Sequence, residues 1–190
     1  MKLKVLMLGI AVTCAAPLAM AEGPAGFYGA VDFGKTTADG FCDGAAAAGF
    51  SCTDNDTSVR FTLGKQLNDN FGVEGSYGPA VEATGSGFGL TYVAKNTEWQ
   101  FAAVGIAPAG NGFSVFGKFG MAFWEIQESL TGFQSQTTSG NDFLMGFGVK
   151  IDINPTTAIR GQYETHKIGD DATTGRNDLN TLSMGLLFKF

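Results

Sequence analysis

The sequence predicts an all-β protein, an eight-stranded antiparallel up-and-down transmembrane β-barrel. Short stretches alternate apolar and polar residues, which is the period of a strand with two different faces. The chain holds 28 glycines and 17 phenylalanines, and Gly, Asn and Asp cluster between the alternating stretches as turn signals. After the N-terminal segment, no apolar run reaches the roughly 18 residues of a transmembrane helix. A membrane protein built from helices is therefore excluded.

The N-terminal segment has the three parts of a secretory signal peptide. Two lysines precede an apolar stretch from Val5 to Ala16, and Ala19-Met20-Ala21 supplies small residues for cleavage. We expect a cleaved signal at 1–21 and one barrel domain at 22–190. Lipid attachment at Cys14 is the alternative, although the Ala-Val-Thr before it is a poor lipobox.

Eight stretches show the alternation of a strand, and each has about the 9 to 11 residues that cross a bilayer at a tilt. Eight is the smallest even number of strands in a bacterial barrel. One strand has two partly apolar faces, which predicts a β-bulge within Thr97–Ala107. The predicted strands are Gly26–Lys35, Thr57–Gln66, Phe71–Pro79, Thr97–Ala107, Phe113–Trp124, Asp142–Ile153, Thr157–His166 and Asn180–Phe190.

The connections alternate between short and long. Outer-membrane barrels have short periplasmic turns and long extracellular loops, so both termini are predicted in the periplasm. The three tight turns are Leu67–Asn70, Pro108–Gly112 and the turn around Asn154–Thr156, and the four long polar loops are Thr36–Asp56, Ala80–Asn96, Glu125–Asn141 and Lys167–Leu179.

Acidic residues concentrate in the long loops. Without the signal peptide, 10 basic residues face 18 acidic ones, a net charge of −8, and the four loops hold −7 of it. Nucleic acid is therefore not an expected partner. The loops present an acidic surface to a ligand that the sequence does not name.

The large apolar residues of each strand are predicted to face lipid, because the interior of eight strands has room only for ordinary side chains. In the last strand, the lipid-facing row consists of Leu182, Met184, Leu186, Phe188 and Phe190. The opposite faces carry charges of both signs, which suits a lumen closed by salt bridges. The predicted lumen charges are Asp32, Arg60, Glu74, Lys118, Lys150, Arg160 and Glu164. Aromatic residues near strand ends are expected at the membrane interfaces, namely Tyr77, Trp99, Trp124 and Tyr163.

Cys42 and Cys52 are the only cysteines after the signal peptide, and both lie in the first long loop. An oxidising compartment favours a disulfide between them. No histidine or second cysteine pair stands nearby to complete a zinc site, so neither a metal nor a cofactor is expected. His166, the only histidine, lacks a serine at the neighbouring same-face position, and no enzyme is predicted.

Four segments carry a resemblance to a known family. They are Gly26–Gly34, the loop from Cys42 to Cys52, Gly110–Gly120 and Leu182–Phe190. These resemble the OmpA-like and opacity-type outer-membrane β-barrel proteins, over essentially the whole mature chain. The apolar alternation that ends at Phe190 resembles the signal read by the outer-membrane assembly machinery.

The family resemblance also implies a pair inside the barrel. A glutamate and an arginine form a gate in OmpA, and Glu74 and Arg160 stand at the matching positions. Lys150 and Ala103 depart from the OmpA pattern, which has an acidic residue and a lysine there. The peptidoglycan-binding module of OmpA is not expected in this chain.

The resulting hypothesis is a structural, surface-exposed barrel of the Gram-negative outer membrane, with acidic extracellular loops that mediate adhesion or another interaction. A narrow, gated porin is the alternative. A lipid-modifying enzyme that depends on His166 and a soluble lipocalin-like barrel are more remote. The expected partners are outer-membrane lipid, lipopolysaccharide, periplasmic chaperones and the assembly machinery.

Overall fold

The computed structural model describes residues 26–43, 49–168 and 177–190, and the predicted signal peptide lies outside them. The described residues form nine β-strands and turns. Their bounds are β1 Phe27–Asp39, β2 Ser51–Thr53, β3 Asn55–Gln66, β4 Phe71–Gly87, β5 Leu90–Gly110, β6 Phe113–Leu130, β7 Gln136–Asn154, β8 Thr157–Ile168 and β9 Asn177–Lys189.

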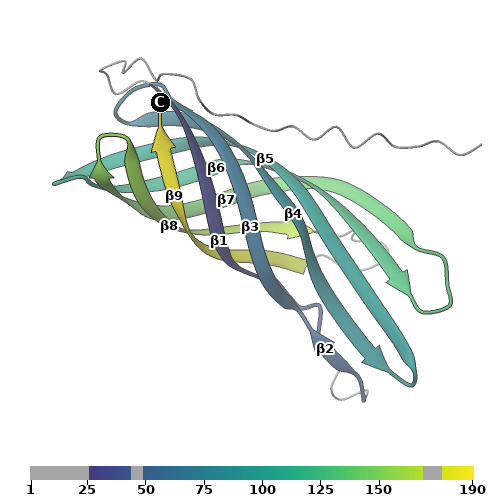
Figure 1. Ribbon diagram of the computed structural model, residues 1–190. Coiled ribbons are helices and arrows are strands. Elements are labelled where there is room, and N and C mark those ends of the chain that lie inside the picture. Colours follow the sequence, from purple (N-terminus) through teal and green to yellow (C-terminus); the bar gives the residue numbers. More distant parts are fainter. Residues whose placement is uncertain (1–25, 44–48, 169–176) are drawn as a thin grey trace, which may run out of the picture.

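Eight of the strands close into a barrel, as Figure 1 shows. Each neighbouring pair is antiparallel, and the ring runs β3-β1-β9-β8-β7-β6-β5-β4 and back to β3. The short strand β2 pairs only with β4 and lies outside this ring. The predicted eight-stranded antiparallel barrel is confirmed.

The barrel has two unlike ends. The short-turn end carries the three tight turns together with the start of β1 and the end of β9. One of these turns has positive φ at Asn111 (54°) and Gly112 (74°), the backbone of a two-residue hairpin turn that asparagine and glycine favour. The long-hairpin end, to which β4 to β7 extend in Figure 1, carries the remaining connections.

Two predicted loops are largely strand, and this corrects the prediction. Residues 80–96 continue β4 and β5 to a two-residue turn at Phe88 and Gly89. Most of residues 125–141 likewise belongs to β6 and β7, and only 131–135 connect them. These segments lack the outward row of large apolar residues that marks the predicted strands. Backbone pairing with neighbouring strands, rather than burial of large side chains, holds them as sheet.

The outward face between the two ends is apolar. Large exposed side chains include Phe33 (59% exposed), Phe101 (57%), Phe147 (66%) and Met184 (67%). Soluble monomers do not expose apolar patches of this extent, whereas a transmembrane barrel needs such a band against lipid. The part of the chain that the structure describes contains no helix long and apolar enough to cross a membrane.

The predicted bulge within Thr97–Ala107 is wrong, because this stretch of β5 pairs with β6 in unbroken register. The register shifts instead lie between Gly78 and Val81 in β4, between Pro108 and Gly110 in β5 and between Asp152 and Asn154 in β7. The first two irregular segments contain a proline, Pro79 in one and Pro108 in the other. Proline has no N–H for the ladder and occurs in strands at edges or bulges, which explains both positions.

Candidate functional site

The barrel interior is filled by charged side chains near its middle. Arg160 is 2% exposed, and Asp32 and Glu164 are each 1% exposed. A buried charge is stable only when it is paired and hydrogen-bonded. The members of this charge network are Asp32, Arg60, Glu74, Glu98, Lys118, Arg160, Glu164 and His166, contributed by β1, β3, β4, β5, β6 and β8.

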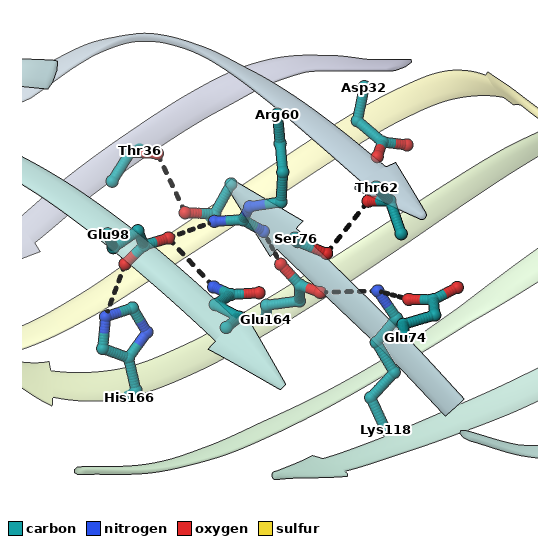
Figure 2. Close-up of polar contacts among 12 residues, drawn as sticks. Asp32, Thr36, Arg60, Thr62, Glu74, Ser76, Glu98, Lys118, Glu164 and His166 are labelled. Carbon is teal, nitrogen blue, oxygen red and sulfur yellow. Dashed lines mark hydrogen bonds and ion pairs between the residues drawn. The ribbon is translucent and has the colours of Figure 1, made fainter. Parts of the chain in front are cut away.

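One half of the charge network runs from β8 through β5 and β3, as Figure 2 shows. His166 Nε2 lies 2.9 Å from Glu98 Oε2, and Arg60 Nη2 lies 2.5 Å from Glu98 Oε1. The other terminal nitrogen of Arg60, Nη1, contacts Glu164 Oε2. Arg60 therefore bridges two carboxylates on different strands.

The other half continues through β6 and β4 to β1. Lys118 Nζ lies 2.9 Å from Glu164 Oε1 and 2.5 Å from Glu74 Oε2. Arg160 Nη1 lies 2.8 Å from Glu74 Oε1. Its Nε and Nη2 donate to the two oxygens of Asp32 at 2.8 and 2.5 Å, a bidentate pair. The network is thus one continuous path in which acidic and basic groups alternate.

Neutral side chains add hydrogen bonds to the charged groups of the network. Tyr28 Oη donates to Glu74 Oε1 at 2.8 Å, and Arg160 Nη2 donates to Thr62 Oγ1 at 2.9 Å. Gln100 Nε2 donates to Glu98 Oε1 at 2.9 Å. Tyr28 and Gln100 thus donate to oxygens that also accept from Arg160 and Arg60, and such additional hydrogen bonds strengthen a buried polar network.

Glycines on the neighbouring strands make room for these side chains. A Cβ atom at Gly185 of β9 would overlap the Asp32 carboxylate, and one at Gly64 of β3 would overlap the ring of Tyr28. The glycines are therefore part of how the sequence fits large polar groups into a narrow barrel.

Apolar layers lie on both sides of the charge network. Toward the short-turn end, Tyr28, Ala30, Ala158 and Leu187 pack together. Toward the long-hairpin end, the apolar cluster is Ala38, Trp124, Ile168 and Leu179.

Cavities remain on the two sides of the network. One of about 30 Å³ is lined by Tyr28, Glu74 and Arg160, and one of about 270 Å³ opens among the long hairpins. The network separates these spaces.

The predicted lumen charges do not all meet. Asp32, Arg60, Glu74, Lys118, Arg160 and Glu164 lie in one connected network. Lys150 faces the lumen, where it lines the smaller cavity with Arg160, but it does not join the connected network, which corrects the prediction of one network. It lies near the short-turn end, 3.7 Å from Asp152, because it is only four residues before the end of β7.

The prediction from the sequence placed Trp124 wrongly and did not include Glu98 among the interior residues. Trp124 is buried inside the barrel, 6% exposed, and not at a membrane interface. Trp124 and Lys118 are both even-numbered residues of β6, so they share one face of the strand. The alternation of β6 thus indicated that Trp124 faces the interior. Glu98 shares the inward face of β5 with Gln100 but was not selected, because that strand has aromatic and apolar residues on both faces.

The remaining predicted residues lie at the surface or the ends. Cys42 and Cys52 form the predicted disulfide, with a Cα–Cα distance of 5.6 Å. The apolar row of β9 faces outward, from Leu182 (65% exposed) to Phe190 (52%). No cluster of His, Cys, Asp or Glu within residues 26–43, 49–168 and 177–190 is arranged to hold a metal ion.

An apolar outer band around a closed barrel with a polar, ion-paired interior defines an integral β-barrel of the bacterial outer membrane. A family model described as outer membrane protein beta-barrel domain matches residues 5–190. The chain belongs to this family and is a protein of the Gram-negative outer membrane. No curated protein sequence matches the chain.

Solved structures share the fold at low sequence identity. Ail, the attachment invasion locus protein of Yersinia pestis, is 18% identical with a TM-score of 0.56, covering 89% of this chain and 99% of Ail. Neisserial surface protein A is 14% identical with a TM-score of 0.61 and coverages of 86% and 97%. OprG from Pseudomonas aeruginosa is 15% identical with a TM-score of 0.60 and coverages of 88% and 97%.

Proposed function

We propose that this protein is a closed, non-enzymatic surface barrel, which displays an acidic outer end for contact with a cationic partner. The observation that carries the proposal is the continuous charge network across the lumen. Six strands contribute to it, and its side chains are almost completely buried. An interior filled in this way supports a structural and display role over an open conduit.

The long-hairpin end is proposed as the extracellular end, and the chain termini as periplasmic. Outer-membrane barrels place short turns in the periplasm and long connections outside. The acidic residues described there are Asp39, Asp43, Asp54, Asp56, Glu82, Glu125, Glu128 and Asp178, against Lys95 and Lys167. Lys95 pairs with Glu82 at 2.6 Å, and Lys167 Nζ lies 3.9 Å from Asp178 Oδ1, so most of these acidic residues are not paired with either lysine.

This charge argues for a cationic rather than a polyanionic partner. Ail has been crystallised with the heparin analogue sucrose octasulfate. A sulfated ligand of that kind would be repelled by the acidic outer end of the present chain. A basic protein segment or a polyamine has the complementary charge.

The lipid-facing band is proposed to contact outer-membrane lipid, including the acyl chains of lipopolysaccharide. The outward row of β9 is proposed as the segment read by the assembly machinery and by periplasmic chaperones. Its members are Leu182, Met184, Leu186, Phe188 and Phe190.

A gated pore is the second candidate, because cavities lie on both sides of the charge network. Rearrangement of the Glu74–Arg160 pair, now 2.8 Å apart, would have to join them. The resemblance of this pair to the gate of OmpA supports the candidate.

Conductance in planar bilayers tests the two candidates. Purified wild-type protein is compared with Glu74→Ala and Arg160→Ala, and Glu125→Ala on the exposed outer face serves as the control. The closed barrel predicts no conductance in the wild type and in the control. Silence of all four proteins excludes the pore. Wild-type channel events that grow when the pair is broken would overturn the closed-barrel proposal.

A further inference from the structure

A cavity forms a cup at the long-hairpin end of the barrel. Its volume is about 270 Å³, slightly below the roughly 300 Å³ at which sites for drug-sized ligands begin. The cup lies above the apolar cluster of Ala38, Trp124, Ile168 and Leu179, three of which also line it. It is separate from the ion pairs of the charge network.

The walls of the cup are apolar because of the bulge in β4. Gly78 pairs with Glu98, and Val81 pairs with Asn96, so two β4 residues stand opposite one β5 residue. This extra residue reverses the parity of the strand. Val81 therefore lines the cup, and the carboxylate of the neighbouring Glu82 pairs with Lys95.

One side of the cup combines aromatic rings with a carboxylate. Phe41 and Tyr92 stack with their ring centroids 5.9 Å apart, and both line the cavity. Tyr92 Oη donates a hydrogen bond to Glu128 Oε1, which also lines the cavity. Burial and this contact with Glu128 hold the pKa of Tyr92 well above its ordinary value, so the hydroxyl remains a donor.

A buried acceptor faces the same region. Asn96 is 7% exposed and lines the cup, and its Oδ1 atom has no hydrogen-bond partner among the described residues. A buried acceptor without a partner is costly, and a donor on a ligand would remove that cost.

The charge of the cup is negative. Its acidic lining residues are Asp54, Glu82 and Glu128, and Glu82 is already paired with Lys95. None of the described lining residues is a lysine, arginine or histidine. Asp54 and Glu128 therefore face the cavity with no basic side chain among the described residues that line it.

We propose that the cup binds a small organic ammonium ion with an apolar body. The apolar walls take the body, and the rings of Phe41 and Tyr92 with the Glu128 carboxylate take the charge. Where the ion carries N–H groups, Asn96 Oδ1 accepts one of them. This inference does not depend on whether the barrel conducts or on which partner meets its outer surface.

Titration calorimetry on the refolded full chain in detergent micelles tests the proposal. The probes are benzylammonium and phenyltrimethylammonium, with benzyl alcohol as the neutral control and benzoate as the anionic control. The critical variant is Glu128→Gln. Its matched control is Glu125→Gln, which removes the same charge from the same strand at a position outside the cup.

The expected result is binding of both ammonium probes, at least about tenfold weaker binding of benzyl alcohol, and no binding of benzoate. Glu128→Gln should weaken ammonium binding about tenfold or more, and Glu125→Gln should leave it within about twofold. Ala83→Phe, which fills the cup without changing its charge, should abolish binding.

Three results would overturn the proposal. The first is the absence of binding heat with both ammonium probes. The second is an equal loss of ammonium affinity in the two glutamate variants, and the third is wild-type ammonium affinity in Ala83→Phe. Heat-modifiable gel mobility confirms that each variant is folded, so a lost signal reports the cup itself.

Discussion

At the scale of single residues, the interior is stabilised by the alternation of charge along one path. Lys118 lies between Glu164 and Glu74, and Arg60 lies between Glu98 and Glu164. Removal of one member leaves its neighbours buried with too little opposite charge, and breaking a buried pair typically costs about 3–5 kcal/mol. The charged side chains also need space in the narrow lumen, which glycines on neighbouring strands provide.

Gly185 provides a test of that space. Its backbone needs no special φ, but an added Cβ would overlap the Asp32 carboxylate and the carbonyl oxygen of Val31. Gly185→Ala should destabilise the barrel by about 1–3 kcal/mol, since Asp32 must shift from its bidentate contact with Arg160. Urea unfolding in micelles measures this change.

The matched control for that substitution is Gly105→Ala. Gly105 has no heavy atom within 4 Å of an added Cβ, so this variant should equal or exceed the wild type in stability. An unchanged unfolding free energy for Gly185→Ala would show that the interior has more freedom than the structure indicates.

The charge types inside the barrel were predictable from strand parity, but their contacts were not. Arg60, Glu74 and Arg160 follow from alternation on single strands. Which charges meet depends on the stagger between strands, and this brings Lys118 to Glu164 and takes Lys150 to the short-turn end. A sequence has no local signal for that stagger.

At the scale of elements, the bulge at Pro79 and Ala80 decides which side chains enter the cup. Deletion of Ala80 should restore regular pairing, with Pro79 opposite Thr97, and should keep Val81 opposite Asn96 and Glu82 opposite Lys95. A spin label at Thr84→Cys, which pairs opposite Val93, should therefore keep its mobility in the deletion variant. Electron paramagnetic resonance gives the readout.

A label at Val73→Cys serves as the control, because Val73 lies before the bulge and faces outward. Its mobility should not change. If the label at position 84 becomes immobile while the label at position 73 does not, the hairpin has slipped by one residue, and Ala80 is not the extra residue of the bulge.

The strand cores were predictable, whereas the hairpin extensions were not. The strands were predicted from the alternation of apolar residues. This alternation ends after Phe123 in β6, and in β7 it begins only at Phe143. The residues beyond are mostly polar or small, and their pairing with a neighbouring strand keeps them extended. Pro79 and Pro108 marked the bulges in the sequence, but the ambiguous faces of β5 drew the prediction to the wrong segment.

At the scale of the whole molecule, β9 closes the barrel by pairing with β1 on one side and β8 on the other. Phe190 N donates to Phe27 O at 2.9 Å, a bond that a side-chain substitution retains. Phe190 and Leu182 stand at opposite ends of the outward row, 52% and 65% exposed. Their side chains therefore contribute to stability mainly through contact with lipid.

The assembly role proposed for this row makes the two positions unequal in the cell. Phe190→Ala and Leu182→Ala should each lower the unfolding free energy in micelles by a similar amount, about 1–2 kcal/mol. In cells, Phe190→Ala should reduce the heat-modifiable barrel in the outer membrane several-fold, while Leu182→Ala leaves it near the wild-type level. Quantitative blots of outer-membrane fractions measure this. Equal losses in cells would mean that stability alone controls assembly, and the row would then be a lipid-facing surface without a recognition role.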